Sequence, residues 1–340
     1  MTAGSTHGDG QHRDPNASIK RALGELGARM RGAFEGQDTR YGPFRVLQLV
    51  ATGGVAEVFA AARDGEPDDG DALRYAVKVL KPGVEAEEVL KRFARERDIL
   101  AALAHRSIVQ VVDSGVTADG RPWIAMPLID GPPITVAADE RRLTLDARIA
   151  LFADALAAVA AAHDSGVLHR DLKPANILVD GADGRLVPRV IDFGIARAMD
   201  GRHVRLTPES IAHRLGTPDY MAPEQWEYGI GACEKQSDVF ALGIVLGELM
   251  AGVLPRDGEP VKSRGQRPAP PLAPSKALLR LSALDAVRAN ELAARRGFAD
   301  ADACARALAA RVDTVVAKAT AADPAARFAD AGAMRAALLK

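Results

Sequence analysis

The sequence contains little cysteine, few aromatic residues and no long hydrophobic run. Cys233 and Cys304 are the only cysteines in 340 residues and form no CxxC pair, so neither a disulfide framework nor a structural zinc site is expected. The 44 Lys and Arg residues are balanced by 45 Asp and Glu residues, and a net charge of −1 disfavours bulk binding to nucleic acid or acidic membranes. The most apolar run, 239–254, is interrupted by Glu248 and is shorter than the roughly 20 residues that span a bilayer. These absences predict a cytoplasmic protein with no membrane span and no nucleic-acid partner.

The residues that are present describe an ordinary globular chain preceded by a polar segment. Hydrophobic residues make up 48% and charged residues 26% of the sequence, as is usual in soluble domains. Residues 1–15 are polar, whereas the apolar residues of 16–35 recur at helical spacing, namely Ile19, Leu23, Leu26, Met30 and Phe34. We therefore predict an N-terminal extension over 1–40. Its helix at 16–35 either packs against its own domain or docks a partner.

The remaining chain changes from strand-like to helical patterns. Short β-rich runs separated by Gly, Asp and Pro occupy 43–50, 56–62, 73–80, 108–116 and 122–126, and one helix is expected at 85–104. Helical patterns then follow at 144–165, 221–227, 237–252, 276–296, 301–321 and 330–339. An antiparallel sheet with one helix, followed by a helical half, predicts a two-lobed α+β fold.

The most informative motif is His-Arg-Asp-Leu-Lys-Pro-Ala-Asn at 169–176, followed by Asp-Phe-Gly at 192–194. A His-Arg-Asp triplet alone is a weak signal, but here a lysine, an asparagine and a second Asp follow it in the order of a known pattern. The combination resembles the catalytic and metal-binding loops of the bacterial eukaryotic-type (Hanks-type) serine/threonine protein kinases. The resemblance covers about 41–340 and implies the two-lobed protein kinase fold, with an N-lobe at 41–128 and a C-lobe at 129–340.

These residue types suit the chemistry of phosphoryl transfer. Negative charge spreads over the transferred group, so the protein supplies position and positive charge more than covalent chemistry. By the resemblance, Asp171 orients the substrate hydroxyl and accepts its proton, while Lys173 offsets the charge of the phosphoryl group. Asn176 and Asp192 offer the oxygen ligands that Mg²⁺ prefers, and Mn²⁺ could substitute for it. Without the resemblance, the same residues would read as solvated charges in a turn at a strand end.

An anchor for the ATP phosphates is expected from a strand lysine and a helix glutamate. The lysine of Tyr-Ala-Val-Lys at 75–78 has apolar neighbours typical of the family's strand, which assigns Lys78 to this role. Glu96, in the segment Arg-Phe-Ala-Arg-Glu at 92–96, matches the position of its ion-pair partner. A pair of surface charges is the alternative, and for Glu96 alone it is competitive.

The glycine-rich loop departs from the family pattern. Gly53 keeps the middle glycine and Gly54 stands beside it, but Ala51 and Ala56 replace the two flanking glycines. Glycine permits positive φ angles and close approach of the backbone to phosphates, and alanine is its mildest replacement. The resemblance implies that this loop covers ATP, whereas the loop taken alone could be a plain hairpin turn.

The resemblance also implies an adenine pocket between the two lobes. Val58, Ala76 and Leu178 would sandwich the base, Met126 would be the gatekeeper, and 127–129 would form the hinge. Pro127 has no N–H, so Ile129 supplies the amide donor. The complete set of residues assigned to ATP binding is Val50, Gly53, Gly54, Val58, Ala76, Lys78, Glu96, Met126, Ile129 and Leu178.

A further segment, Gly-Thr-Pro-Asp-Tyr-Met-Ala-Pro-Glu at 216–224, resembles the platform on which protein substrates bind. The resemblance pairs its last residue, Glu224, with Arg327. Between 192 and 224, Thr207 and Ser210 are candidate autophosphorylation sites, because an arginine before the catalytic Asp marks family members that are organised by a phosphate on this loop.

These observations predict a serine/threonine protein kinase that uses ATP and Mg²⁺ and acts on Ser and Thr hydroxyls of proteins. One alternative is a pseudokinase scaffold with the same fold, which the alanines of the glycine loop favour and the intact catalytic residues disfavour. A second is a small-molecule kinase of the aminoglycoside phosphotransferase type, which generally lacks the lysine after the catalytic Asp and the 216–224 platform.

Overall fold

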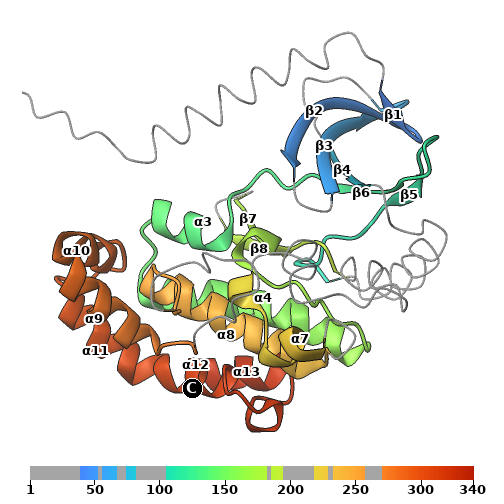
Figure 1. The fold of residues 1–340 in the computed structure, drawn as a ribbon. Helices are drawn as coiled ribbons and strands as arrows, with labels where there is room; N and C mark the ends of the chain where they lie inside the picture. The colour runs from blue at the N-terminus through green and yellow to red at the C-terminus, as the bar shows by residue number, and fades with distance from the viewer. Residues whose placement is uncertain are drawn as a thin grey trace, which may run out of the picture.

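Figure 1 shows the computed structural model of the chain, with a twisted β-sheet at one end and a set of packed helices at the other. The structure describes residues 39–52, 56–66, 74–81, 105–181, 185–193, 218–228, 233–256 and 270–340. The helices that we predicted at 16–35 and 85–104 lie outside these residues. The division of the chain into 1–40 and 41–340 stays a prediction.

The sheet contains strands β1 (Arg40–Tyr41), β2 (Phe44–Thr52), β3 (Ala56–Arg63), β4 (Tyr75–Leu80), β5 (Asp113–Val116) and β6 (Pro122–Pro127). They pair antiparallel in the order β1-β2-β3-β4-β6-β5. Four of the five predicted strand runs therefore match strands closely. The exception is the run at 108–116, in which only 113–116 forms a strand.

The residues at the start of that run pair with the helical lobe instead of with the sheet. Val109 donates its N–H to Val190 O at 3.0 Å, and the N–H of Val190 donates to Ser107 O at 2.7 Å. Ile108 forms an isolated parallel bridge with the same valine. The segment therefore joins the sheet part to a hairpin of the helical part, and a β-rich composition does not distinguish this from a strand in a sheet.

Strand β4 buries both of its faces, because alternate side chains of a strand point to opposite sides. Val77 and Val79 join one apolar cluster, around Phe44 and Trp123. Ala76 and Leu80 join the other, with Met126 and Ile124. Lys78 lies on the same face of the strand as Ala76 and Leu80, and this face is directed toward the helical lobe.

The helical lobe contains α3 (Ile134–Glu140), α4 (Leu145–Asp164), α7 (Pro223–Tyr228), α8 (Lys235–Ala251), α9 (Pro274–Leu284), α10 (Ala286–Arg295), α11 (Ala301–Arg311), α12 (Asp313–Ala319) and α13 (Ala331–Leu338). A two-stranded hairpin of β7 (Ile177–Asp180) and β8 (Val187–Val190) packs against them. The helices predicted at 276–296 and 301–321 are each two helices. Asp285 ends the first and caps α10 by accepting from Arg288 N–H, and Val312 separates α11 from α12. Helix α3 lies in a region for which we predicted no helix.

Helix α8 forms the centre of this lobe (Figure 1). Nearly every one of its residues is buried, as the apolar run at 239–254 suggested. Its core is continuous with that of α4 and with Ile177 and Val190 of the β7–β8 hairpin. The loop between α4 and β7, which contains the motif at 169–176, is therefore held at both ends by the main core. Among the described helices, none combines the length and apolarity needed to cross a membrane.

Candidate active site

The predicted catalytic residues form one hydrogen-bonded group in the loop between α4 and β7. Lys173 Nζ lies 2.8 Å from Asp171 Oδ2. Asn176 donates through Nδ2 to the backbone oxygen of Asp171 at 2.6 Å and to Asp171 Oδ2 at 3.1 Å. The short helix Pro174–Asn176 turns the chain so that these side chains face one another. The structure thus brings together the carboxylate, the ammonium and the amide that the motif supplies.

The β7–β8 hairpin places the two predicted metal ligands at the same end. Ile177 pairs with Val190, and the N–H of Ile191 donates to the backbone oxygen of Asn176 at 3.0 Å. Asn176 therefore precedes one strand and Asp192 follows the other at the adjoining ends. Asp192 has a φ of +67°, a left-handed conformation that is uncommon for residues other than glycine. Such strain is typical of functional turns.

An ion pair crosses from the sheet to the helical lobe. Lys78 Nζ lies 2.7 Å from Asp192 Oδ2, and the two side chains are 18% and 16% exposed. The partner that we predicted for Lys78, Glu96, lies outside the described residues, so that pairing stays a prediction. The contact with Asp192 brings the predicted phosphate anchor to the predicted metal ligand.

A buried aspartate on α8 holds the backbone before the catalytic residue. Asp238 Oδ2 accepts from the N–H of His169 at 2.8 Å, and its Oδ1 accepts from the N–H of Arg170 at 2.7 Å. His163, at the end of α4, lies with Nε2 3.0 Å from Asp238 Oδ2. Burial raises the pKa of Asp238, but the hydrogen bonds from His163 and from the His169 backbone outweigh it and hold that pKa below its usual value. Asp238 is therefore an acceptor that fixes the loop.

The His169 side chain connects the two loops of the site. Its Nε2 lies 2.8 Å from Ile191 O, so Nε2 carries the proton, and Nδ1 accepts from the N–H of Asp171 at 3.3 Å. Its ring lies 4.7 Å from that of Phe193, which is buried. The imidazole thus ties the backbone of Asp171 to the segment that carries Asp192.

Most of the predicted adenine residues gather in one apolar cluster of the sheet lobe. Ala76 and Met126 are buried members of this cluster, and Val58 and Ile129 pack against it. In the described part of the chain, no acceptor binds the N–H of Ile129, whereas Leu128 N–H donates to Arg74 O. Leu178 lies outside this cluster, on β7, where it bridges Pro133.

Several predicted residues are placed differently or not described. Val50, near the end of β2, is 50% exposed and does not belong to any of the apolar clusters. Gly53, Gly54, Thr207 and Ser210 lie outside the described residues, so their roles stay predictions.

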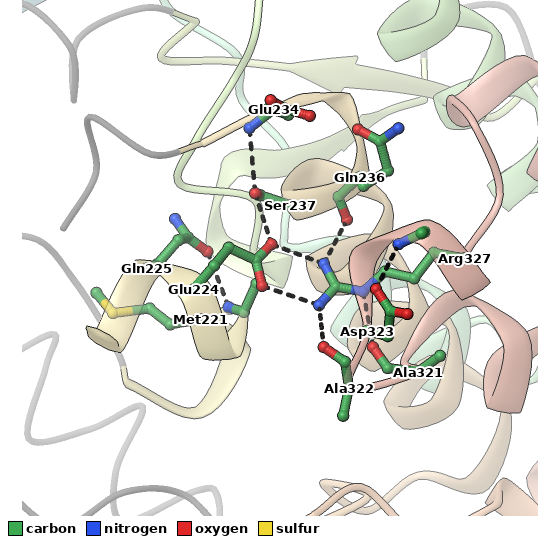
Figure 2. A network of polar contacts seen from close by, with 12 residues as sticks. Met221, Glu224, Gln225, Glu234, Gln236, Ser237, Ala321, Ala322, Asp323 and Arg327 are labelled. Carbon is green, nitrogen blue, oxygen red and sulfur yellow. Dashed lines mark hydrogen bonds and ion pairs between the residues drawn. The ribbon is translucent and has the colours of Figure 1, made fainter. Parts of the chain in front are cut away.

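The predicted pairing of Glu224 with Arg327 is confirmed (Figure 2). Arg327 binds the two carboxylate oxygens of Glu224 at 2.7 and 2.8 Å, and its other N–H groups donate to the backbone oxygens of Gln236, Ala321 and Ala322. Ser237 donates to Glu224 at 2.7 Å. Burial raises the pKa of Glu224, but the Arg327 and Ser237 hydrogen bonds prevail and lower it. This network fastens α7 to α8 and to the segment before α13.

A separate cavity of about 630 Å³ lies between α7, α8 and α12. Its walls are mostly apolar and include Met221, Trp226, Phe240 and Val316. None of the described residues that we assigned to catalysis, metal or ATP lines it. The cavity is therefore separate from the Asp171 group.

Comparison with known proteins agrees with this geometry. The model of the family described as the protein kinase domain matches residues 44–273. The chain belongs to the protein kinase family. Both the predicted family and its two-lobed fold are thereby confirmed.

Within the kinase family, the chain is similar to bacterial serine/threonine kinases. It is 34% identical over 219 residues to the probable serine/threonine-protein kinase PknB of Lactococcus lactis, which covers 64% of this chain and 32% of that protein. It is also 34% identical over 283 residues to the serine/threonine-protein kinase PknA of Mycobacterium tuberculosis, covering 79% of this chain and 62% of the relative. The chain thus spans less than two thirds of the length of either relative.

A solved kinase structure shares the fold. The PknI kinase domain of M. tuberculosis superposes with a TM-score of 0.57 at 26% identity, over 88% of this chain and 96% of that domain. The agreement over most of both chains supports the arrangement of a sheet lobe and a helical lobe.

The motif reading missed the residues that hold the kinase loops from behind. The helical pattern at 237–252 does not indicate that Asp238 binds the catalytic loop, and the motifs single out neither His163 nor Gln225. Each is polar and buried. A polar residue at the edge of an apolar run, such as the Asp that opens α8, is the signal that could have found them, because buried polar groups need partners.

Proposed function

We propose that this chain is a protein serine/threonine kinase, which transfers the γ-phosphoryl group of ATP to Ser and Thr hydroxyls of proteins. The observation that carries the proposal is the convergence of Asp171, Lys173 and Asn176 with the Lys78–Asp192 ion pair at 2.7 Å. The similarity to bacterial serine/threonine kinases supports the substrate class. Few other chemistries need a carboxylate, two ammonium groups and two oxygen ligands on facing lobes.

Asp171 and Lys173 would act directly on the reacting groups. The Asp171 carboxylate would accept the proton of the substrate hydroxyl as that oxygen attacks phosphorus. Lys173 Nζ, 2.8 Å from this carboxylate, would also contact the transferred phosphoryl group and offset its charge. The Asn176 amide would keep the carboxylate oriented by its hydrogen bond to Oδ2.

The donor set suits Mg²⁺, or Mn²⁺ in its place. Asn176 uses Nδ2 to bind Asp171, which leaves its amide oxygen as a ligand, and the Asp192 carboxylate is a hard anionic oxygen donor. When bound, the ion would neutralise charge on the phosphates. Asp192 would then share its carboxylate between that ion and Lys78.

Lys78 would anchor the α- and β-phosphates, with Glu96 as its partner, and the apolar cluster of the sheet lobe would receive the adenine. Val58, Ala76 and Met126 of this cluster would supply apolar contacts. Val50 on β2 and Leu178 on β7, which lie outside the cluster, would add to them. The N–H of Ile129 would donate to the base. Gly53 and Gly54 would cover the phosphates.

Regulation and context are proposed from the sequence. Autophosphorylation at Thr207 or Ser210 would raise activity through the arginine before the catalytic Asp. The helix at 16–35 would pack against its own domain or dock a partner, and the protein would act in the cytoplasm. Phosphopeptide mapping that finds neither hydroxyl modified in active enzyme would contradict the autophosphorylation proposal.

The central test is phosphate transfer from γ-labelled ATP and Mg²⁺ to casein, followed by phosphoamino-acid analysis of the product. Wild type should label serine or threonine, and Asp171→Asn should abolish the label. Asp164→Asn, the same change at the exposed end of α4, is the matched control and should keep wild-type activity. Absence of transfer by the wild type would favour the pseudokinase alternative, and equal labelling by wild type and Asp171→Asn would refute the assignment of the site.

A further inference from the structure

The side chain of Gln225 joins the substrate platform to the catalytic loop. Gln225 lies on α7 and is 2% exposed. Its Oε1 accepts from the N–H of Ala222 at 2.8 Å, and its Nε2 donates to the backbone oxygen of Arg170 at 3.2 Å. One amide therefore binds a residue of the 216–224 segment and the residue immediately before Asp171.

The backbone at Arg170, which Gln225 contacts, is strained and is held by several hydrogen bonds. Arg170 has a φ of +72°, in the left-handed region that costs energy for a residue with a β-carbon. Asp238 binds its N–H, Gln225 binds its carbonyl oxygen, and His169 Nδ1 accepts from the N–H of Asp171. The carbonyl and the N–H of the Arg170–Asp171 peptide are thus both engaged. Removal of the Gln225 donor leaves a part-buried carbonyl without this bond and frees one side of the peptide.

Helix α7 provides a fixed base for this contact. Its neighbouring residue, Glu224, is fastened to Arg327 and Ser237, whereas Gln225 points to the other side of the helix (Figure 2). A six-residue helix has little stability of its own, so these contacts fix its position. Through Gln225, the position of α7 therefore determines the position of the Arg170 carbonyl.

We propose that Gln225 is a positioning residue, which couples the substrate platform to the orientation of Asp171. This inference rests on the proposed kinase function. Asp171 is one residue beyond the clamped carbonyl, so the direction of its carboxylate depends on the peptide that Gln225 holds. Gln225 touches neither substrate nor nucleotide in this role. Its loss should therefore lower kcat and leave the KM for ATP unchanged.

Two variants of nearly equal size test the coupling in the full chain. Gln225→Glu keeps an acceptor for Ala222 but presents a carboxylate to the Arg170 carbonyl, and Gln225→Met removes both hydrogen bonds. We expect kcat at pH 8 to fall by about 10-fold in each, the size of one buried hydrogen bond. Gln236→Glu, the same change on α8 in a side chain that makes none of the contacts described above, is the control and should keep wild-type kcat.

The pH dependence separates positioning from a general loss of structure. Charged and titratable groups around Gln225 are Arg170, Asp171, Tyr220, Glu224, Cys233 and Asp238. The ratio of kcat for Gln225→Glu to that of wild type should rise as pH falls from 8 to 6, because a protonated carboxyl donates to the carbonyl again. The ratio for Gln225→Met should stay constant, since methionine does not titrate.

Three results would overturn the inference: both variants within twofold of wild-type kcat, a loss confined to the KM for ATP, or a Gln225→Glu ratio that is independent of pH. Thermal unfolding of each variant is measured in parallel. If Gln225→Glu does not fold, a kcat for folded Gln225→Met within twofold of wild type decides against the role. A wild type that phosphorylates no acceptor would contradict the proposed function instead, which keeps the two failures distinguishable.

Discussion

The two lobes secure their polar groups in different ways. In the sheet lobe, Lys78 stands among apolar neighbours, and its described ion-pair partner, Asp192, belongs to the other lobe. In the helical lobe, the buried charges of Asp238 and Arg327 find their partners within the lobe itself. The catalytic loop is therefore set by the helical lobe alone. The phosphate anchor depends on how the lobes are placed.

The contrast extends to the arginines at the end of α8. Arg148 and Arg296 are buried, and both donate to the backbone oxygen of Leu249 in the last turn of that helix. Carbonyls at a helix C-terminus lack intrahelical partners and attract cations. Burial lowers the pKa of Arg296 to about 10, which still leaves it charged at neutral pH. Such buried cations stabilise the helical lobe without any contact to the site.

The largest effect on stability is expected from breaking the network of Figure 2. Arg327→Ala leaves the Glu224 carboxylate without its bidentate partner, and the loss of one member of a buried ion pair costs about 3–5 kcal/mol. Urea unfolding at pH 7 should show this loss in the folding free energy. Arg335→Ala, at another arginine of the same C-terminal region that donates to a single backbone oxygen, should cost much less. Equal losses would show that the Glu224 pair has no special weight.

The opposite profile is expected in the sheet lobe. Lys78→Met should lower kcat/KM by about 100-fold, as does the loss of one electrostatic contact to a reacting group. Its effect on unfolding should be small, because the pair is partly exposed and joins two lobes. Lys81→Met, just beyond the same strand, is the matched control for phosphate-transfer assays. A stable Lys78→Met variant with wild-type activity would contradict the anchoring role.

This division explains which features the sequence could predict. Asp171, Asn176 and Asp192 could be predicted from the sequence, because their chemistry depends on residue type and short spacing. Strand β4 and helix α8 could also be predicted, because alternating apolar residues specify the strand and a continuous apolar run specifies the helix.

The contacts that hold the catalytic loop could not be predicted from the sequence, because they join segments that are distant in the chain. Gln225 and Asp238 bind the backbone of 169–170 across 55 to 69 positions of the chain, and His163 contacts Asp238 across 75 positions. A local sequence pattern does not record such pairings. The misassigned segment at 108–112 has the same cause. Its residues fit a strand pattern, yet the N–H of Val109 donates to Val190 in the other lobe.

A matched pair of core substitutions compares the two lobes directly. Leu156→Ala lies in the large core of the helical lobe, and Leu80→Ala lies in a small cluster of the sheet lobe. Leucine-to-alanine changes cost about 2–5 kcal/mol, and less where the surroundings can collapse into the space. We expect Leu156→Ala to cost about 1 kcal/mol more than Leu80→Ala in urea unfolding. A larger loss at Leu80 would show that the sheet lobe is the more rigidly packed of the two.

The smallest effect is a pH dependence that belongs to the helical lobe. The folded pKa of Glu224 lies below its ordinary value of 4.5, because the Arg327 and Ser237 hydrogen bonds outweigh burial. A depressed carboxyl pKa contributes stability that is fully present above the unfolded pKa and is lost as pH falls through the folded one.

Glu224→Gln removes this titration. The gap in unfolding free energy between wild type and Glu224→Gln should therefore be fully present at pH 7 and shrink steadily as pH falls below 4.5. Glu227→Gln, at an exposed position of the same helix, should show a smaller gap at pH 7. Urea titrations at pH 7, 5, 4 and 3 measure both gaps. A Glu224→Gln gap that persists unchanged at pH 3 would mean that the Glu224 contact stabilises the lobe by packing rather than by charge.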